Sequence, residues 1–135
     1  MQARIVAGIV AVIVAGVVMG MGMQMMTMPN PQGDQVPMMA MVAQILGSDS
    51  LIVAWLYHLF NSAVIGAIFG LLLGGFATSY GRALGWGALY GFAWWILGGL
   101  ILMPMLLGNA PFAPLMMPEM HMAALGRLIG HLMYG

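Results

Sequence analysis

Charged side chains are too rare in this chain for a water-soluble fold. Among its 135 residues are only three basic and three acidic side chains, while 63% of the residues are hydrophobic. Charged residues occupy about a quarter of the positions in soluble globular domains. Six charges cannot cover the surface of a domain of this length, so the composition predicts an integral membrane protein.

The apolar residues are gathered into runs of membrane-spanning length. About 20 helical residues cross a hydrocarbon core about 30 Å thick. We therefore predict an all-α fold, an integral membrane four-helix bundle that forms a single membrane domain over residues 1–135. The predicted spans cover residues 4–28, 50–74, 83–107 and 119–135. A shorter apolar segment, residues 38–47, is expected to form an interfacial helix between the first two spans.

The few charges also predict an orientation. Arg4 and Arg82 fall at one end of the predicted spans, and the three carboxylates fall at the other. The positive-inside rule then places both termini in the cytoplasm and the two proline-rich loops outside, in a multi-pass protein of the cell (inner or plasma) membrane. The first apolar run is longer than the core of a signal peptide, so we interpret it as a retained helix.

The composition also excludes several classes of function. Cysteine is absent, which removes disulfides, thiolate metal sites and cysteine nucleophiles. The three arginines lie far apart, whereas nucleic-acid binding needs a clustered basic surface. No nucleophile–base pair, glycine-rich phosphate loop or pair of carboxylates is present, so we do not expect an enzyme.

Glycines at a spacing of four residues are expected to hold the helices together. Close backbone approach drives helix association in lipid, and residues four apart share one helix face. The predicted packing glycines are Gly16 and Gly20 on the first span, Gly66, Gly70 and Gly74 on the second, Gly87 and Gly91 on the third, and Gly126 and Gly130 on the fourth. Packing within the bundle and contact with a partner subunit are both open interpretations.

Polar side chains at membrane depth form a second group of candidates. The predicted intramembrane cluster contains His58, Asn61, Ser62, Arg127, His131 and Tyr134. One interpretation is hydrogen bonding between helices, with Arg127 reaching Asp49 or Glu119. In another, His58 and His131 are axial ligands of haem or a chlorophyll-type pigment. A third is a proton relay or a quinone-facing site. The sequence does not require a cofactor, and the identity of any cofactor that binds stays unknown.

Methionine is unusually frequent, with 17 residues in the chain. All but Met1 and Met133 fall at or near the predicted outer side. Thioethers suit Cu(I), so a copper site is one interpretation of this pattern. Its candidate ligands are Met21, Met23, Met25, Met117, Met120 and His121. The alternative is that these side chains fill irregular apolar surfaces or contact a protein partner.

Two further patterns concern the chain as a whole. His58-Leu59-Phe60 and His131-Leu132-Met133 occupy equivalent places in the two halves, which suggests duplication of a helical hairpin. The segments GALYGFAWWILGGLILMPMLLG and LIGHLMYG resemble a group of small four-span prokaryotic membrane proteins of unknown function. That group has a WxxxxxxxMP third helix and a GHLxYG fourth helix that continues beyond the motif. The resemblance implies a four-span membrane fold and brings no activity.

We therefore expect a small, non-catalytic accessory or structural subunit of a larger membrane complex, such as a respiratory or photosynthetic one. Its partners would be the lipid bilayer and other membrane protein subunits. The alternative is a methionine-rich protein that handles copper or transports a small solute.

Overall fold

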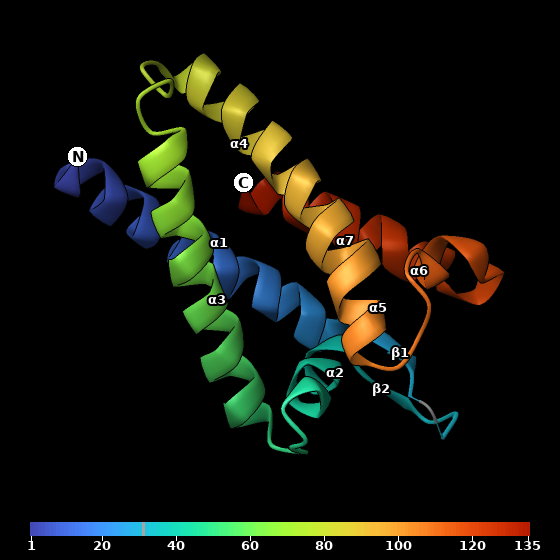
Figure 1. Ribbon diagram of the computed structural model, residues 1–135. Helices are drawn as coiled ribbons and strands as arrows, with labels where there is room; N and C mark the ends of the chain where they lie inside the picture. Colours follow the sequence, from blue (N-terminus) through green and yellow to red (C-terminus); the bar gives the residue numbers. More distant parts are fainter. Residues whose placement is uncertain (31) are drawn as a thin grey trace.

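The computed structural model describes residues 1–30 and 32–135 and is mostly helical (Figure 1). Residue 31, in the first proline-rich loop, lies outside the described residues. The elements are α1 (Gln2–Met25), β1 (Thr27–Pro29), β2 (Gln35–Pro37), α2 (Met38–Ile45), α3 (Leu51–Leu72), α4 (Tyr80–Trp94), the π-helix η1 (Trp95–Leu102), α5 (Met103–Leu106), α6 (Ala113–Met116), the 3₁₀-helix η2 (Pro118–Met120) and α7 (His121–Tyr134).

Three helices are long and apolar enough to cross a membrane. They cover Gln2–Met25, Leu51–Leu72 and Tyr80–Leu106, where the last combines α4, η1 and α5. Each overlaps one of the first three predicted spans. The fourth predicted span is represented by η2 and the 14-residue α7, which at 1.5 Å per residue is about 21 Å long. The number of spans beyond three therefore stays a prediction.

A short β-hairpin follows α1 and corrects the expectation of a purely helical chain. Helix α1 ends at Met25, earlier than predicted, because Pro29 favours extended backbone before it. Strands β1 and β2 then pair antiparallel, with Met28 opposite Val36. The side chain of Asn30 closes the turn by accepting hydrogen bonds from the backbone N–H groups of residues 32 and 34.

Helices α1 and α3 form the first helix pair through very close backbone contact. Gly8 of α1 lies directly against the backbone of Gly66 and Gly70 of α3. Further along the same seam, Gly16 meets the side chain of Ser62. Since Gly8, Gly16 and Gly66 are all buried, the seam is the contact that small residues make possible in lipid.

Helices α4 and α7 form the second pair in a similar way. Gly87 and Gly91 of α4 lie against the backbone of His131 and Gly135. Gly135 follows His131 by four residues, as Ser62 follows His58, and each meets a glycine of the preceding long helix. These equivalent contacts support the duplication suggested by the sequence. By contrast, Gly126 of α7 faces the side chain of Met26, just after α1, and Gly130 faces the side chain of Met19 on α1.

Helix α2 is buried against the rest of the protein. Met38 and Met39 at its start are 1% and 0% exposed, and Ala43 is also buried. Met39 and Ala43 pack with Ala54 of α3 in one apolar cluster. The segment predicted as an interfacial helix is thus helical, and protein covers much of its surface; its position relative to a membrane stays a prediction.

The third long helix is irregular in its C-terminal half. Its π-helical stretch runs into Pro104, which lacks the N–H that would bond the carbonyl of Leu100. That carbonyl instead accepts a hydrogen bond of 2.6 Å from the backbone N–H of Phe112. The bond ties the proline-rich loop to the helix, and Phe112 adopts a left-handed conformation with φ of 63°. Figure 1 shows α3 and α4 diverging from the turn that joins them.

Candidate functional site

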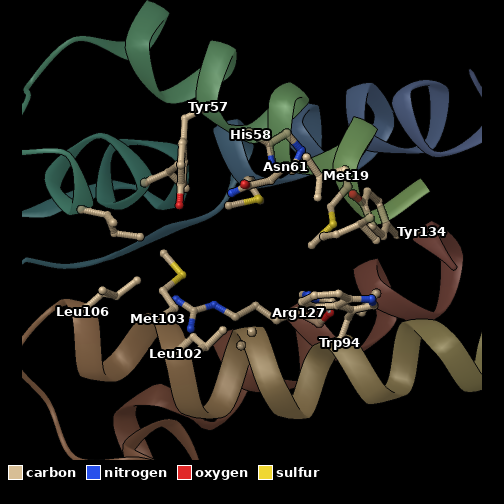
Figure 2. Close-up of a pocket in the computed structure, with 18 residues that line it drawn as sticks. Met19, Tyr57, His58, Asn61, Trp94, Leu102, Met103, Leu106, Arg127 and Tyr134 are labelled. Atoms are coloured by element: carbon tan, nitrogen blue, oxygen red, sulfur yellow. Dashed lines mark hydrogen bonds between the residues drawn. The ribbon is translucent and has the colours of Figure 1, made fainter. Parts of the chain in front are cut away.

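A cavity of about 310 Å³ lies between the two helix pairs, and we call it the central cleft (Figure 2). It is lined by residues of α1, α2, α3 and α7 and of the helix from Trp94 to Leu106. Its walls are mostly apolar and include Met19, Leu102 and Met103. The volume lies at the lower end of the range of about 300–1,000 Å³ for small-molecule sites.

Five polar residues of the predicted intramembrane cluster line this cleft. His58 and Asn61 come from α3, and Arg127, His131 and Tyr134 come from α7. Figure 2 shows His58 and Asn61 on one side of the opening and Arg127 on the other. The sixth predicted residue, Ser62, is fully buried and its side chain lies against Gly16 of α1. Its hydroxyl donates a hydrogen bond of 2.8 Å to the carbonyl of residue 58 within α3.

Each cleft histidine uses one ring nitrogen to anchor itself. Nε2 of His58 lies 2.8 Å from the carbonyl of Gly16, and Nδ1 of His131 lies 2.7 Å from the carbonyl of Arg127. A carbonyl only accepts, so each of these nitrogens carries the hydrogen and donates it. The other nitrogen of each neutral ring is then an acceptor. Nδ1 of His58 and Nε2 of His131 are therefore the atoms with which these rings could meet a ligand.

Arg127 is the most deeply buried charged residue of the described chain, with 6% of its surface exposed. Its Nε donates to the sulfur of Met38 at 3.4 Å, and its Nη2 donates to the sulfur of Met28 at 3.0 Å. These sulfurs, and not Asp49 or Glu119, the carboxylates considered from the sequence, are the acceptors found for it among the described residues. Both carboxylates lie exposed in connecting segments, while the β-hairpin and the start of α2 bring the two sulfurs to the guanidinium.

Two further cavities also meet at Arg127. One of about 460 Å³ runs along α1 and α7 and is lined by Met26 and Gly130. The other, of about 420 Å³, lies beside the proline-rich loops and is lined by Met28 and Glu119. Arg127 lines both of them as well as the central cleft, so this one residue borders three cavities.

The predicted copper ligands do not gather into one place. Met21 and Met25 are 56% and 83% exposed, whereas Met23 packs inward. Successive helical residues point about 100° apart, so alternate methionines on a helix cannot converge on one ion. Met117 is exposed, and Nε2 of His121 donates a hydrogen bond of 2.7 Å to the carbonyl of residue 115.

Another set of methionines does come together, and of the predicted copper ligands only Met23 and Met120 pack against it. Met28, Met38 and Met41 form a buried cluster. Met23, Met26, Met103 and Met120 pack against it. Two of the buried sulfurs accept hydrogen bonds from the Arg127 cation, which disfavours a second cation at these atoms. Residues 1–30 and 32–135 also contain no group of three or more His, Asp or Glu side chains that could hold a metal ion.

Sequence reasoning missed the two sulfur acceptors of Arg127 because they lie 89 and 99 positions before it in the chain. It also missed Tyr57 and Trp94, which line the central cleft. The one signal that could have pointed to the sulfurs is the density of methionine on both sides of the hairpin, together with an arginine that has no acidic residue at the same depth.

Comparisons with protein-family models, with curated proteins and with solved structures find no match to this chain. The resemblance carried by the segments ending at Gly108 and Gly135 therefore stays a resemblance. Function is argued below from the geometry of the central cleft and its polar residues.

Proposed function

We propose that this chain is a non-catalytic membrane protein that binds a small, largely apolar molecule with a polar group in the central cleft. The observation that carries the proposal is the convergence of polar groups from both helix pairs on one apolar cavity. Small-molecule sites have this composition, with apolar walls for affinity and a few placed polar groups for orientation. Three of the helices that line the cleft are long and apolar enough to cross a membrane, so its occupant would come from the lipid phase.

The hydrogen-bonding state of the polar residues supports a bound molecule. A polar group at membrane depth is costly unless it has a partner. The two cleft histidines each keep one ring nitrogen without a partner among the described residues, and Asn61 makes no side-chain hydrogen bond with them. A ligand with one or two polar atoms would satisfy these groups at once.

The cleft also has a mouth through which such a molecule could enter. Val64, Leu102 and Leu106 line the cavity, yet they are 43%, 44% and 60% exposed. They belong to α3 and to the third long helix, which diverge from their connecting turn (Figure 1). An apolar mouth of this kind would open toward lipid chains and not toward water.

Filling the cleft from its own wall tests the proposal. Gly98 lines the cleft, and a Cβ added there would have no atom within 4 Å. The Cβ of Gly98→Phe therefore meets no neighbour, and the ring would extend from the wall into the cavity. Gly85 of α4 has the same open surroundings and does not line the cleft, so Gly85→Phe is the matched control.

The measurement is mass spectrometry of small molecules that co-purify with the protein in mild detergent. We expect one apolar compound at a similar molar ratio in the wild type and in Gly85→Phe, and at least a tenfold lower ratio in Gly98→Phe. An equal ratio in all three proteins, or no such compound in the wild type, would contradict the proposal.

A second candidate function, that of an accessory subunit in a larger membrane assembly, is favoured by a different observation. Gly81 and Gly85 lie four residues apart on α4, and neither has any atom near its missing Cβ. A helix of another subunit could approach this face closely, as small residues permit in lipid. Gly85→Phe should then release the chain from its assembly on a native gel while the cleft stays filled. Unchanged migration would argue against this role.

A further inference from the structure

Arg127 is a buried cation without a counter-charge in the described part of the chain. All three acidic residues of the protein, Asp34, Asp49 and Glu119, are exposed, and none pairs with it. Its hydrogen-bond acceptors are two thioether sulfurs, which are neutral and weak. Since an unpaired charge inside a membrane protein is costly, residues of this kind tend to pair or to mark a binding site.

The guanidinium also has donors to spare. It carries five N–H groups, and the bonds to Met38 and Met28 use one on Nε and one on Nη2. Three remain, including both on Nη1. Figure 2 shows the side chain extending along one wall of the central cleft, toward Met103 and Leu102. Because Arg127 lines the central cleft together with Leu102 and Met103, we take its free donors to face this cavity.

We infer that the molecule bound in the central cleft is an amphiphilic anion, whose carboxylate or phosphate group binds the guanidinium of Arg127. A planar guanidinium fork matches both oxyanions and can bind either of them through two parallel hydrogen bonds. The apolar chain of the ligand would lie against the apolar wall residues of the same cavity, such as Leu102 and Leu106, which Figure 2 shows beside the guanidinium. This inference rests on the proposed function and adds the chemical class of the ligand.

One competing arrangement lies within the protein itself. Glu119 and Arg127 line the same third cavity, so a rotation of the Glu119 side chain is the alternative source of negative charge. Glu119 precedes α7 in the short η2 segment and is exposed, and its removal should leave the fold intact. Under our inference, Glu119→Gln leaves anion binding unchanged, because the ligand and not Glu119 supplies the charge.

Quenching of tryptophan fluorescence by brominated ligands measures binding directly, since Trp94 lines the cleft. The probes are a brominated long-chain fatty acid and its methyl ester, which share one chain, at pH 8, where the free carboxyl is ionised. In the wild type, the acid should reach half-maximal quenching at a concentration at least tenfold lower than the ester. Gly98→Phe should weaken both.

The two variants of Arg127 separate charge from packing. Arg127→Gln should bring the acid and the ester to equal half-maximal concentrations, while Arg127→Lys should keep most of the preference. If Arg127→Gln does not fold, the comparison of acid and ester in the wild type already decides whether the site prefers an anion. Equal binding of both probes by the wild type overturns the inference and leaves the cleft proposal standing, whereas quenching by neither probe overturns both.

Two more arms identify the source of the oxyanion. Brominated phosphatidylglycerol, with brominated phosphatidylcholine as the zwitterionic control, tests a phospholipid; a tenfold preference for the former supports an anionic lipid as ligand. Acetate and inorganic phosphate test a free anion. If either anion displaces the brominated fatty acid at a concentration as low as the half-maximal concentration of that acid, the site binds a free anion. The inference of an amphiphilic ligand is then overturned. An acid preference that disappears in Glu119→Gln would also overturn it.

Discussion

Replacing Gly70 by alanine should push α1 away from α3. A Cβ at this position would lie closest to the carbonyl oxygen of Arg4, and 2.8 Å from Cα of Ile5 and 3.0 Å from the carbonyl carbon of Arg4. Ordinary van der Waals contact begins at 3.4 Å, so relief of the contact with Ile5 alone requires α1 to retreat by roughly 0.6 Å. All three obstructing atoms belong to the backbone, which cannot rotate aside as a side chain would.

The size of the effect follows from two opposing terms. Overpacking of a well-packed contact costs about 1–3 kcal/mol. Alanine is also the better helix former, by about 1 kcal/mol over glycine. Gly85→Ala provides the second term alone, because nothing lies within 4 Å of the added atom. The free energy of unfolding should therefore be lower in Gly70→Ala than in Gly85→Ala by about 1–3 kcal/mol.

The assay is reversible unfolding in detergent micelles, followed by circular dichroism during titration with a denaturing detergent. A difference of about 1.4 kcal/mol corresponds to a tenfold change in the unfolding equilibrium constant, so the expected effect is measurable. Equal stability of the two variants, or greater stability of Gly70→Ala, would refute the reasoning and show that α1 and α3 do not meet at this seam.

Three other perturbations have defined outcomes. A cysteine at Asn109, in a chain without native cysteines, should react with an impermeant maleimide added to intact cells, and labelling only after lysis would reverse the orientation. Joint replacement of Met21, Met23 and Met25 by leucine should lower the free energy of unfolding by less than about 1.5 kcal/mol, because the volume is kept; loss of a stoichiometric bound copper would instead favour the copper-handling alternative. Arg127→Met should raise the free energy of unfolding by about 1–3 kcal/mol in ligand-free protein, since it removes an unpaired buried charge, and a large loss measured in the same titration would contradict this.

The long helices could be predicted because lipid leaves the backbone little choice. A run of about 20 apolar residues can satisfy its own N–H and C=O groups in a membrane only as a helix. The end of α1 and the hairpin were harder to predict. Strands β1 and β2 have three residues each and contain Pro29 and Pro37, which sequence rules assign to turns. Their pairing depends on contacts between both sides of the turn, which no local pattern encodes.

The candidate site was predictable in part for a similar reason. Helical rise alone places His58 and Arg127 at comparable depth on their helices, and the structure puts both on the central cleft. The partners of Arg127 were not predictable. Electrostatics favours a carboxylate, whereas the acceptors found are the sulfurs of Met28 and Met38, brought there by the hairpin and by α2. Depth along a helix follows from counting residues, but the choice of partner depends on tertiary packing.

The π-helical stretch Trp95–Leu102 gives the cleft wall a place where a deletion of one residue can be absorbed. A π-helix bonds residues five apart and so holds more residues per turn than an α-helix. Deleting one residue there would let the segment close into regular α turns, and the tighter winding would offset most of the rotation of about 100° that the same deletion causes in a regular helix. Met103 and Leu106 would then keep lining the cleft together with His58 and Arg127. A deletion in the regular α4 has no such compensation and would turn these two side chains away from the cleft.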